Sequence, residues 1–114
     1  MRDFILVAKA ISDPTRVRIL KMLEPGPLCV CHITERLGLA QSTVSKHLAQ
    51  LRYAGAVTLR KRGLWAYYSL EKETINSYNQ AFLALLRSAL NDDPQIAADR
   101  EAPETTSCSQ NKVA

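Results

Sequence analysis

Apolar residues in the middle of the chain recur at the spacing of an α-helix in two successive blocks. Ile33 and Leu37 are four residues apart. Beyond a break that contains a glycine, Val44, Leu48 and Leu51 follow at intervals of four and three residues. A helix with one buried face has this spacing. The pattern therefore predicts a helix, a tight turn and a second helix, which together form a helix-turn-helix motif.

The flanking sequence predicts three further helices and a β-hairpin that turns near Gly63. The expected elements are helices over residues 2–11, 14–23 and 71–90 and strands over residues 57–62 and 64–70. The second of these helices has a suitable cap in Asp13, with Pro14 at the first helical position. A two-stranded ribbon directly after a recognition-type helix is a wing. We therefore expect a mainly α fold with a β-hairpin wing, the winged helix-turn-helix.

The charge of the chain is concentrated in this region. From Arg36 to Leu70 there are six basic residues and no acidic residue, whereas the net charge of the whole chain is +4. A merely solvated face mixes both signs, so a segment of one sign favours a surface that faces phosphates. We expect double-stranded DNA as the partner of this segment, and a basic face for some other acidic partner is the alternative.

Candidate DNA-binding residues lie on the polar face of the second helix and near the tip of the wing. Their hydrogen-bonding and cationic side chains suit base edges and phosphates. Any surface helix has a polar outer face, so the charge of the segment decides the assignment. The candidates are Gln41, Ser42, Thr43, Ser45, Lys46, Gln50, Arg52, Arg60, Lys61 and Arg62.

A chain of 114 residues buries a limited core, so dimerisation is an expected source of stability. The apolar arc of the last predicted helix is wider than one small core needs, and we expect a homodimer through the first and last helices. Residues 1–90 should form the DNA-binding and dimerisation domain, and residues 91–114 a mobile polar tail. The sequence shows no run long enough to span a membrane and no signal peptide pattern, which predicts a cytoplasmic protein without a membrane partner.

Three cysteines suggest metal or thiol chemistry, because an odd number in a reducing compartment does not build a disulfide framework. Cys29 and Cys31 are two residues apart at the start of the helix that leads into the turn. On an ideal helix such residues face nearly opposite sides, so both can bind one ion only if the first turn is unwound or distorts on binding. The third donor is left open between Cys108, His32 and a water or buffer thiol.

Several motifs taken together resemble the ArsR/SmtB family of metal-sensing repressors, and more narrowly its arsenical-resistance branch. The motifs are Ser12-Asp13-Pro14-Thr15-Arg16, Leu28-Cys29-Val30-Cys31, residues 41–48, Ala54-Gly55 and the wing from Gly63 to Leu70. The resemblance implies a homodimeric repressor that leaves a palindromic operator when a metal or metalloid binds. It also implies that Cys29 and Cys31 are thiolate ligands for As(III) or Sb(III), with no obligatory cofactor. Members of this branch often have a third cysteine three residues after the second, and Thr34 occupies that position here.

Other functions remain as alternatives. The same repressor scaffold would serve a cadmium or zinc sensor, or a redox switch of the thiol pair. A thiol enzyme is disfavoured, since a reductase usually has its cysteines three apart in a strand–helix unit. We therefore expect no enzymatic activity. A module that binds another protein is the remaining alternative, and binding insensitive to salt would be its sign.

Overall fold

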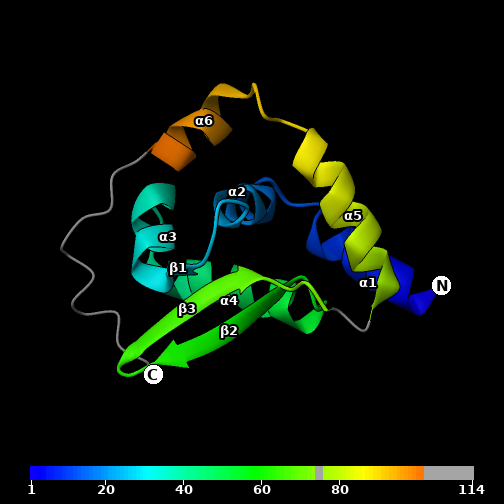
Figure 1. The fold of residues 1–114 in the computed structure, drawn as a ribbon, viewed down its shortest axis with the longest axis horizontal. Coiled ribbons are helices and arrows are strands. Elements are labelled where there is room, and N and C mark those ends of the chain that lie inside the picture. The colour runs from blue at the N-terminus through cyan, green and yellow to red at the C-terminus, as the bar shows by residue number, and fades with distance from the viewer. Residues whose placement is uncertain (74–75, 102–114) are drawn as a thin grey trace.

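The computed structural model describes residues 1–73 and 76–101 and contains a mainly helical fold with one small sheet (Figure 1). In chain order the elements are α1 (Arg2–Ala10), α2 (Pro14–Leu23), β1 (Leu28–Cys29), α3 (Val30–Leu37), α4 (Gln41–Tyr53), β2 (Val57–Arg62), β3 (Trp65–Leu70), α5 (Ser77–Ser88) and α6 (Pro94–Glu101). The helix-turn-helix α3–α4 followed by the β2–β3 wing confirms the predicted fold class. None of the described helices has the length and apolarity to cross a membrane.

The helix-turn-helix is held by the apolar positions that predicted it. Ile33 of α3 and Val44, Leu48 and Leu51 of α4 are all completely buried in the main core. Between the two helices Gly38 has φ 68°, in the left-handed region, and its N–H bonds back to carbonyls of the last turn of α3. A glycine adopts this conformation at little cost, so the turn occurs where the sequence places it.

Helix α2 begins as predicted. The side chain of Asp13 accepts hydrogen bonds from the backbone N–H groups of Thr15 and Arg16 at 2.8 and 3.2 Å. Pro14 occupies the first helical position. An aspartate cap of this kind satisfies N–H groups that have no partner within the helix.

The sheet has one strand more than the hairpin. Strands β2 and β3 pair antiparallel from Val57↔Leu70 to Arg62↔Trp65, and the strand order is β1-β3-β2. The additional strand β1 pairs Leu28 with Tyr68 and Cys29 with Tyr67. The segment before α3, which we expected to begin a helix, is therefore joined to the wing.

The C-terminal part of the chain differs most from the prediction. Helix α5 is shorter than the expected helix over residues 71–90, and it lies beside α1 (Figure 1). The chain then turns back, and α6 packs against α2. The sequence did not predict α6, which falls in the segment expected to be a polar tail. The division of the chain at residue 90 stays a prediction, and residues 102–114, including Cys108, lie outside the described residues.

Lys21 of α2 connects these elements. It is completely buried, and its Nζ donates to Glu24 Oε1 at 2.8 Å, to the carbonyl of Leu86 at 2.8 Å and to Asn91 Oδ1 at 2.9 Å. A buried ammonium is tolerated when its donors are satisfied in this way. Lys21 thus fixes the end of α5 and the turn toward α6 onto α2.

Candidate metal centre and DNA-facing surface

Cys29 and Cys31 lie together because α3 starts between them. Cys29 ends β1 and is the N-cap of α3, with extended backbone angles of φ −77° and ψ 158°, and Cys31 is in the first helical turn. The two Sγ atoms are 3.3 Å apart. The placement of both cysteines on an ideal helix was wrong, because Cys29 precedes the helix, and the two sulfur atoms therefore lie close together with Cys29 extended.

His32 adds a third donor. Its Nδ1 is 3.2 Å from Cys29 Sγ, and one ligand atom from each of Cys29, Cys31 and His32 lies within 4.8 Å of the others. Cys29 is only 2% exposed, whereas Cys31 and His32 are half-buried. The cluster therefore has one buried and two half-buried residues that carry donor atoms. Its sulfur and imidazole atoms are ligands for soft and borderline ions, and the residues present fit such an ion.

Thr34 stands where the arsenical branch often has its third cysteine. Its hydroxyl donates to the carbonyl of Val30 at 2.7 Å. This bond within α3 occupies the hydroxyl, and a threonine hydroxyl is a poor ligand for a soft ion. Thr34 therefore adds no soft donor to the cluster of Cys29, Cys31 and His32.

The predicted DNA-binding residues are all exposed. On α4 the polar candidates are exposed, whereas Val44, Leu48 and Leu51 of the same helix are buried. The three wing candidates lie at the end of β2 that precedes the turn of the hairpin. The helix begins at Ala40 without a side-chain cap. Seven polar residues of α4 and three cations of the wing, the ten candidates named above, thus reach solvent from neighbouring elements.

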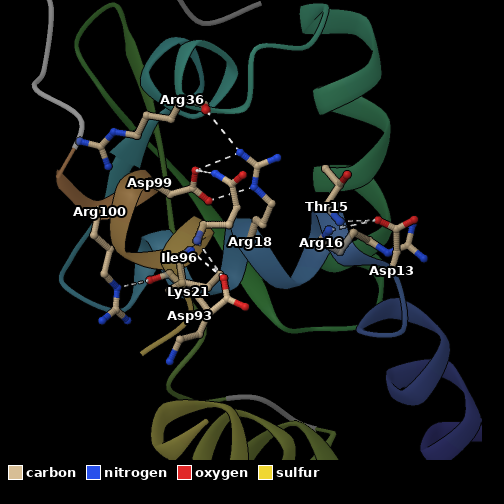
Figure 2. Close-up of polar contacts among 11 residues, drawn as sticks. Asp13, Thr15, Arg16, Arg18, Lys21, Arg36, Asp93, Ile96, Asp99 and Arg100 are labelled. Carbon is tan, nitrogen blue, oxygen red and sulfur yellow. Dashed lines mark hydrogen bonds and ion pairs between the residues drawn. The ribbon is translucent and has the colours of Figure 1, made fainter. Parts of the chain in front are cut away.

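Two arginines that sequence analysis did not assign hold the scaffold instead. Arg16 Nε donates to the carbonyl of Ala10 at 2.5 Å, and its NH1 lies 3.3 Å from Nδ1 of His47 on α4. Arg18 is paired with Asp99 of α6 (Figure 2). Hydrogen bonding to that carboxylate raises the pKa of Arg18 further above its usual value, an effect that desolvation of the guanidinium opposes. The contacts with His47 and Asp99 have no local sequence signal, because these residues lie 31 and 81 positions away.

Comparison with known proteins agrees with this architecture. Residues 13–58 match the family described as bacterial regulatory protein, arsR family. An arsenic resistance transcriptional regulator of Pseudomonas putida is 46% identical over 77 residues, which cover 64% of this chain and 60% of that protein. The arsenical resistance operon repressor of Staphylococcus xylosus is 35% identical over 79 residues, which cover 69% of this chain and 76% of that protein.

A solved structure extends the match to the fold. The homodimeric winged helix-turn-helix DNA-binding domain of Mb0332 from Mycobacterium bovis, described as a possible ArsR-family regulator, superposes with a TM-score of 0.67. It is 25% identical, and the match covers 82% of each chain. Sequence and fold thus lead to the same assignment, and the chain belongs to the ArsR family of bacterial regulatory proteins.

Proposed function

We propose that this protein is a transcriptional repressor that binds its operator as a homodimer and leaves it when As(III) or Sb(III) binds the thiolates of Cys29 and Cys31. The observation that carries the proposal is the 3.3 Å separation of the two sulfur atoms. Trivalent arsenic and antimony are soft centres that prefer thiolate ligands. The similarity to arsenical resistance regulators supports the same inducer.

DNA binding is proposed for the exposed faces of α4 and the wing. In winged helix-turn-helix proteins the second helix enters the major groove, and here it would do so with the polar residues from Gln41 to Arg52. Arg60, Lys61 and Arg62 would lie along the flanking groove or on the backbone. The absence of acidic residues between Arg36 and Leu70 supports this surface, since nothing there repels phosphate.

A homodimer is proposed through α1 and α5, which leave apolar side chains exposed. Phe4 and Ile5 of α1 are 44% and 41% exposed, and Leu85 of α5 is 65% exposed. The ring of Phe4 packs edge-on against Tyr78 with a centroid distance of 5.3 Å, which joins the two helices into one face. A continuous apolar face of this kind suits a self-complementary contact.

Release is proposed to start at the junction of β1 and α3. Cys31 belongs to the first helix of the helix-turn-helix, and Cys29 is paired with Tyr67 of the wing. A metalloid bound to both sulfurs would constrain these two DNA-facing elements at once. Such a shared element couples the inducer site to the operator site.

A second candidate function, sensing of Zn²⁺ or Cd²⁺, is favoured by one observation. The Nδ1 atom of His32 lies 3.2 Å from Cys29 Sγ, so the cluster offers two sulfurs and an imidazole. This donor set suits zinc or cadmium better than arsenic. The two candidates make opposite demands on His32, which an experiment can separate.

The test is fluorescence anisotropy of the reduced protein on DNA of its own promoter. Arsenite, antimonite, Cd²⁺ and Zn²⁺ are titrated at fixed salt, because phosphate contacts make affinity depend steeply on salt. We expect release by arsenite or antimonite that is lost in Cys29→Ser and in Cys31→Ser and kept in His32→Gln. Release by Cd²⁺ or Zn²⁺ alone, lost in His32→Gln, would establish the second candidate. Release by peroxide alone, reversed by dithiothreitol, would instead identify a redox switch.

A further inference from the structure

The turn of the wing exposes an apolar side chain. Leu64 follows Gly63 in the two-residue turn that joins β2 to β3, and it is 65% exposed, as much as Leu85 of α5. Glycine, proline and short polar residues are the usual residues of turns, so the hairpin does not need a leucine here. Single exposed apolar residues are common on protein surfaces, and the place of Leu64 in the fold is therefore what matters.

The turn holds Leu64 in a defined position. Arg62 and Trp65 pair across the strands directly before and after it. Gly63 has φ 60°, whereas Leu64 has no positive φ. A glycine with positive φ at the first of two turn residues is typical of a type II′ turn, whose twist matches that of the strands. Leu64 thus stands at the end of a regular ribbon, so that little backbone freedom is lost when a partner contacts it.

Leu64 lies away from the surface proposed for dimerisation. The turn of the wing is on the opposite side of the molecule from α1 and α5 (Figure 1). Leu85, which is equally exposed, belongs to the proposed dimer surface. The helices that would join two copies therefore leave Leu64 uncovered.

Cations stand beside the exposed leucine. Arg60, Lys61 and Arg62 precede the turn, and all three are exposed. No acidic residue occurs between Arg36 and Leu70. An apolar tip next to a row of cations suits a partner that offers phosphates with less polar surface between them, as the minor groove of double-stranded DNA does. The wing also follows α4 directly, so a duplex bound along α4 would continue toward the wing.

We propose that Leu64 is a wedge that enters the minor groove of the operator and pushes between two neighbouring base pairs. The inference rests on the proposed function in one respect, that the wing lies on DNA. Apolar side chains of minor-groove proteins act in this way, and they partly unstack one base step and bend the duplex. Pyrimidine–purine steps unstack most easily. Leu64 thereby favours operators with such a step beside each half-site, although it forms no hydrogen bond with any base.

The experiment uses 2-aminopurine, a fluorescent adenine analogue that stacking quenches, at successive positions of the protein's own promoter DNA. At saturating protein we expect the fluorescence to rise at one position on each side of the bound site. The rise should be lost in Leu64→Ser and kept in Leu64→Met, which retains an apolar side chain. Both changes are made at an exposed position, so the urea midpoint of unfolding should stay the same.

Operator affinity at several salt concentrations separates the wedge from phosphate contacts. Leu64→Ser should lower the affinity about tenfold without changing its dependence on salt, because the leucine carries no charge. Arg62→Gln is the matched change of a cation next to the turn. It should lower the slope of the salt dependence by about two for a dimer, one for each wing, and keep the fluorescence rise at saturation.

Three results would overturn the proposal. Unchanged affinity and an unchanged fluorescence rise in Leu64→Ser would reject the wedge and leave the operator-binding function intact. The same result, together with loss of binding to phosphatidylglycerol vesicles in Leu64→Ser, would assign Leu64 to a membrane surface instead. Wild type that binds no promoter DNA would reject the proposed function, and the wedge with it.

Discussion

Lys21 shows how one buried charge holds distant parts of the chain. Its ammonium has three acceptors, which come from α2, from the end of α5 and from the turn before α6. Each acceptor satisfies one donor of the buried group, so the charge is not left uncompensated. Nothing in the local sequence marks Lys21 as different from the exposed lysines, because its acceptors Leu86 and Asn91 are 65 and 70 residues away.

Replacing Lys21 with methionine tests this role. Methionine fills a similar volume but leaves the carbonyl of Leu86 and the side chain of Asn91 without their donor. We expect the free energy of unfolding to fall by about 3 kcal/mol, measured by urea denaturation. Lys72→Met, at an exposed lysine, should change it by less than about 0.5 kcal/mol. Equal stability of the two variants would show that Lys21 does not brace these elements.

The distance between the two cysteine sulfurs also depends on the conformation of a single residue. Sequence spacing drew attention to Cys29 and Cys31, whose sulfur atoms are 3.3 Å apart, but an ideal helix put them on opposite faces. The actual separation depends on a single residue, since Cys29 is extended and Cys31 is helical. Helix boundaries are set by such local details and by tertiary pairing, which a periodic pattern does not resolve.

At the scale of elements, patterns with strong local signals were predicted and those that depend on distant partners were not. The Asp13-Pro14 start of α2, the turn between α3 and α4, and the wing follow from capping, glycine and alternation. In contrast, β1 has two residues, and it exists because it pairs with Tyr67 and Tyr68, which are about forty residues away. Helix α6 has a polar sequence, and its ion pairs with α2 hold it in place.

Helix α4 offers a test of a missing cap. Its N-cap is Ala40, whose side chain cannot accept a hydrogen bond from the first N–H groups of the helix. Ala40→Ser should raise the free energy of unfolding by about 1 kcal/mol, measured by denaturant titration. Ala49→Ser, at an exposed position within the same helix, should lower it slightly, since serine is a weaker helix former. A gain in both variants would attribute the effect to composition and not to capping.

At the scale of the whole molecule, the face formed by α1 and α5 is the proposed contact between two copies. Leu85→Glu places a charge on the exposed side of α5. We expect the dissociation constant of the dimer, measured by sedimentation velocity, to rise at least about tenfold. Leu64 in the turn of the wing is equally exposed, at 65%, and Leu64→Glu should leave the dimer intact. A dimer that tolerates Leu85→Glu would place the contact on another face.

The pairing of β1 with β3 has a consequence for how the proposed sensor would respond. Cys29 pairs with Tyr67 of the wing and also belongs to the proposed inducer cluster, so binding at either place would change the affinity at the other. Coupling between two binding sites is reciprocal. If bound arsenite lowers the affinity for the operator by some factor, bound operator lowers the affinity for arsenite by the same factor. The detection threshold is then not a constant of the protein. Cells with more operator copies would need more arsenite to begin transcription. The number of operator copies would therefore help to set the arsenite concentration at which transcription begins.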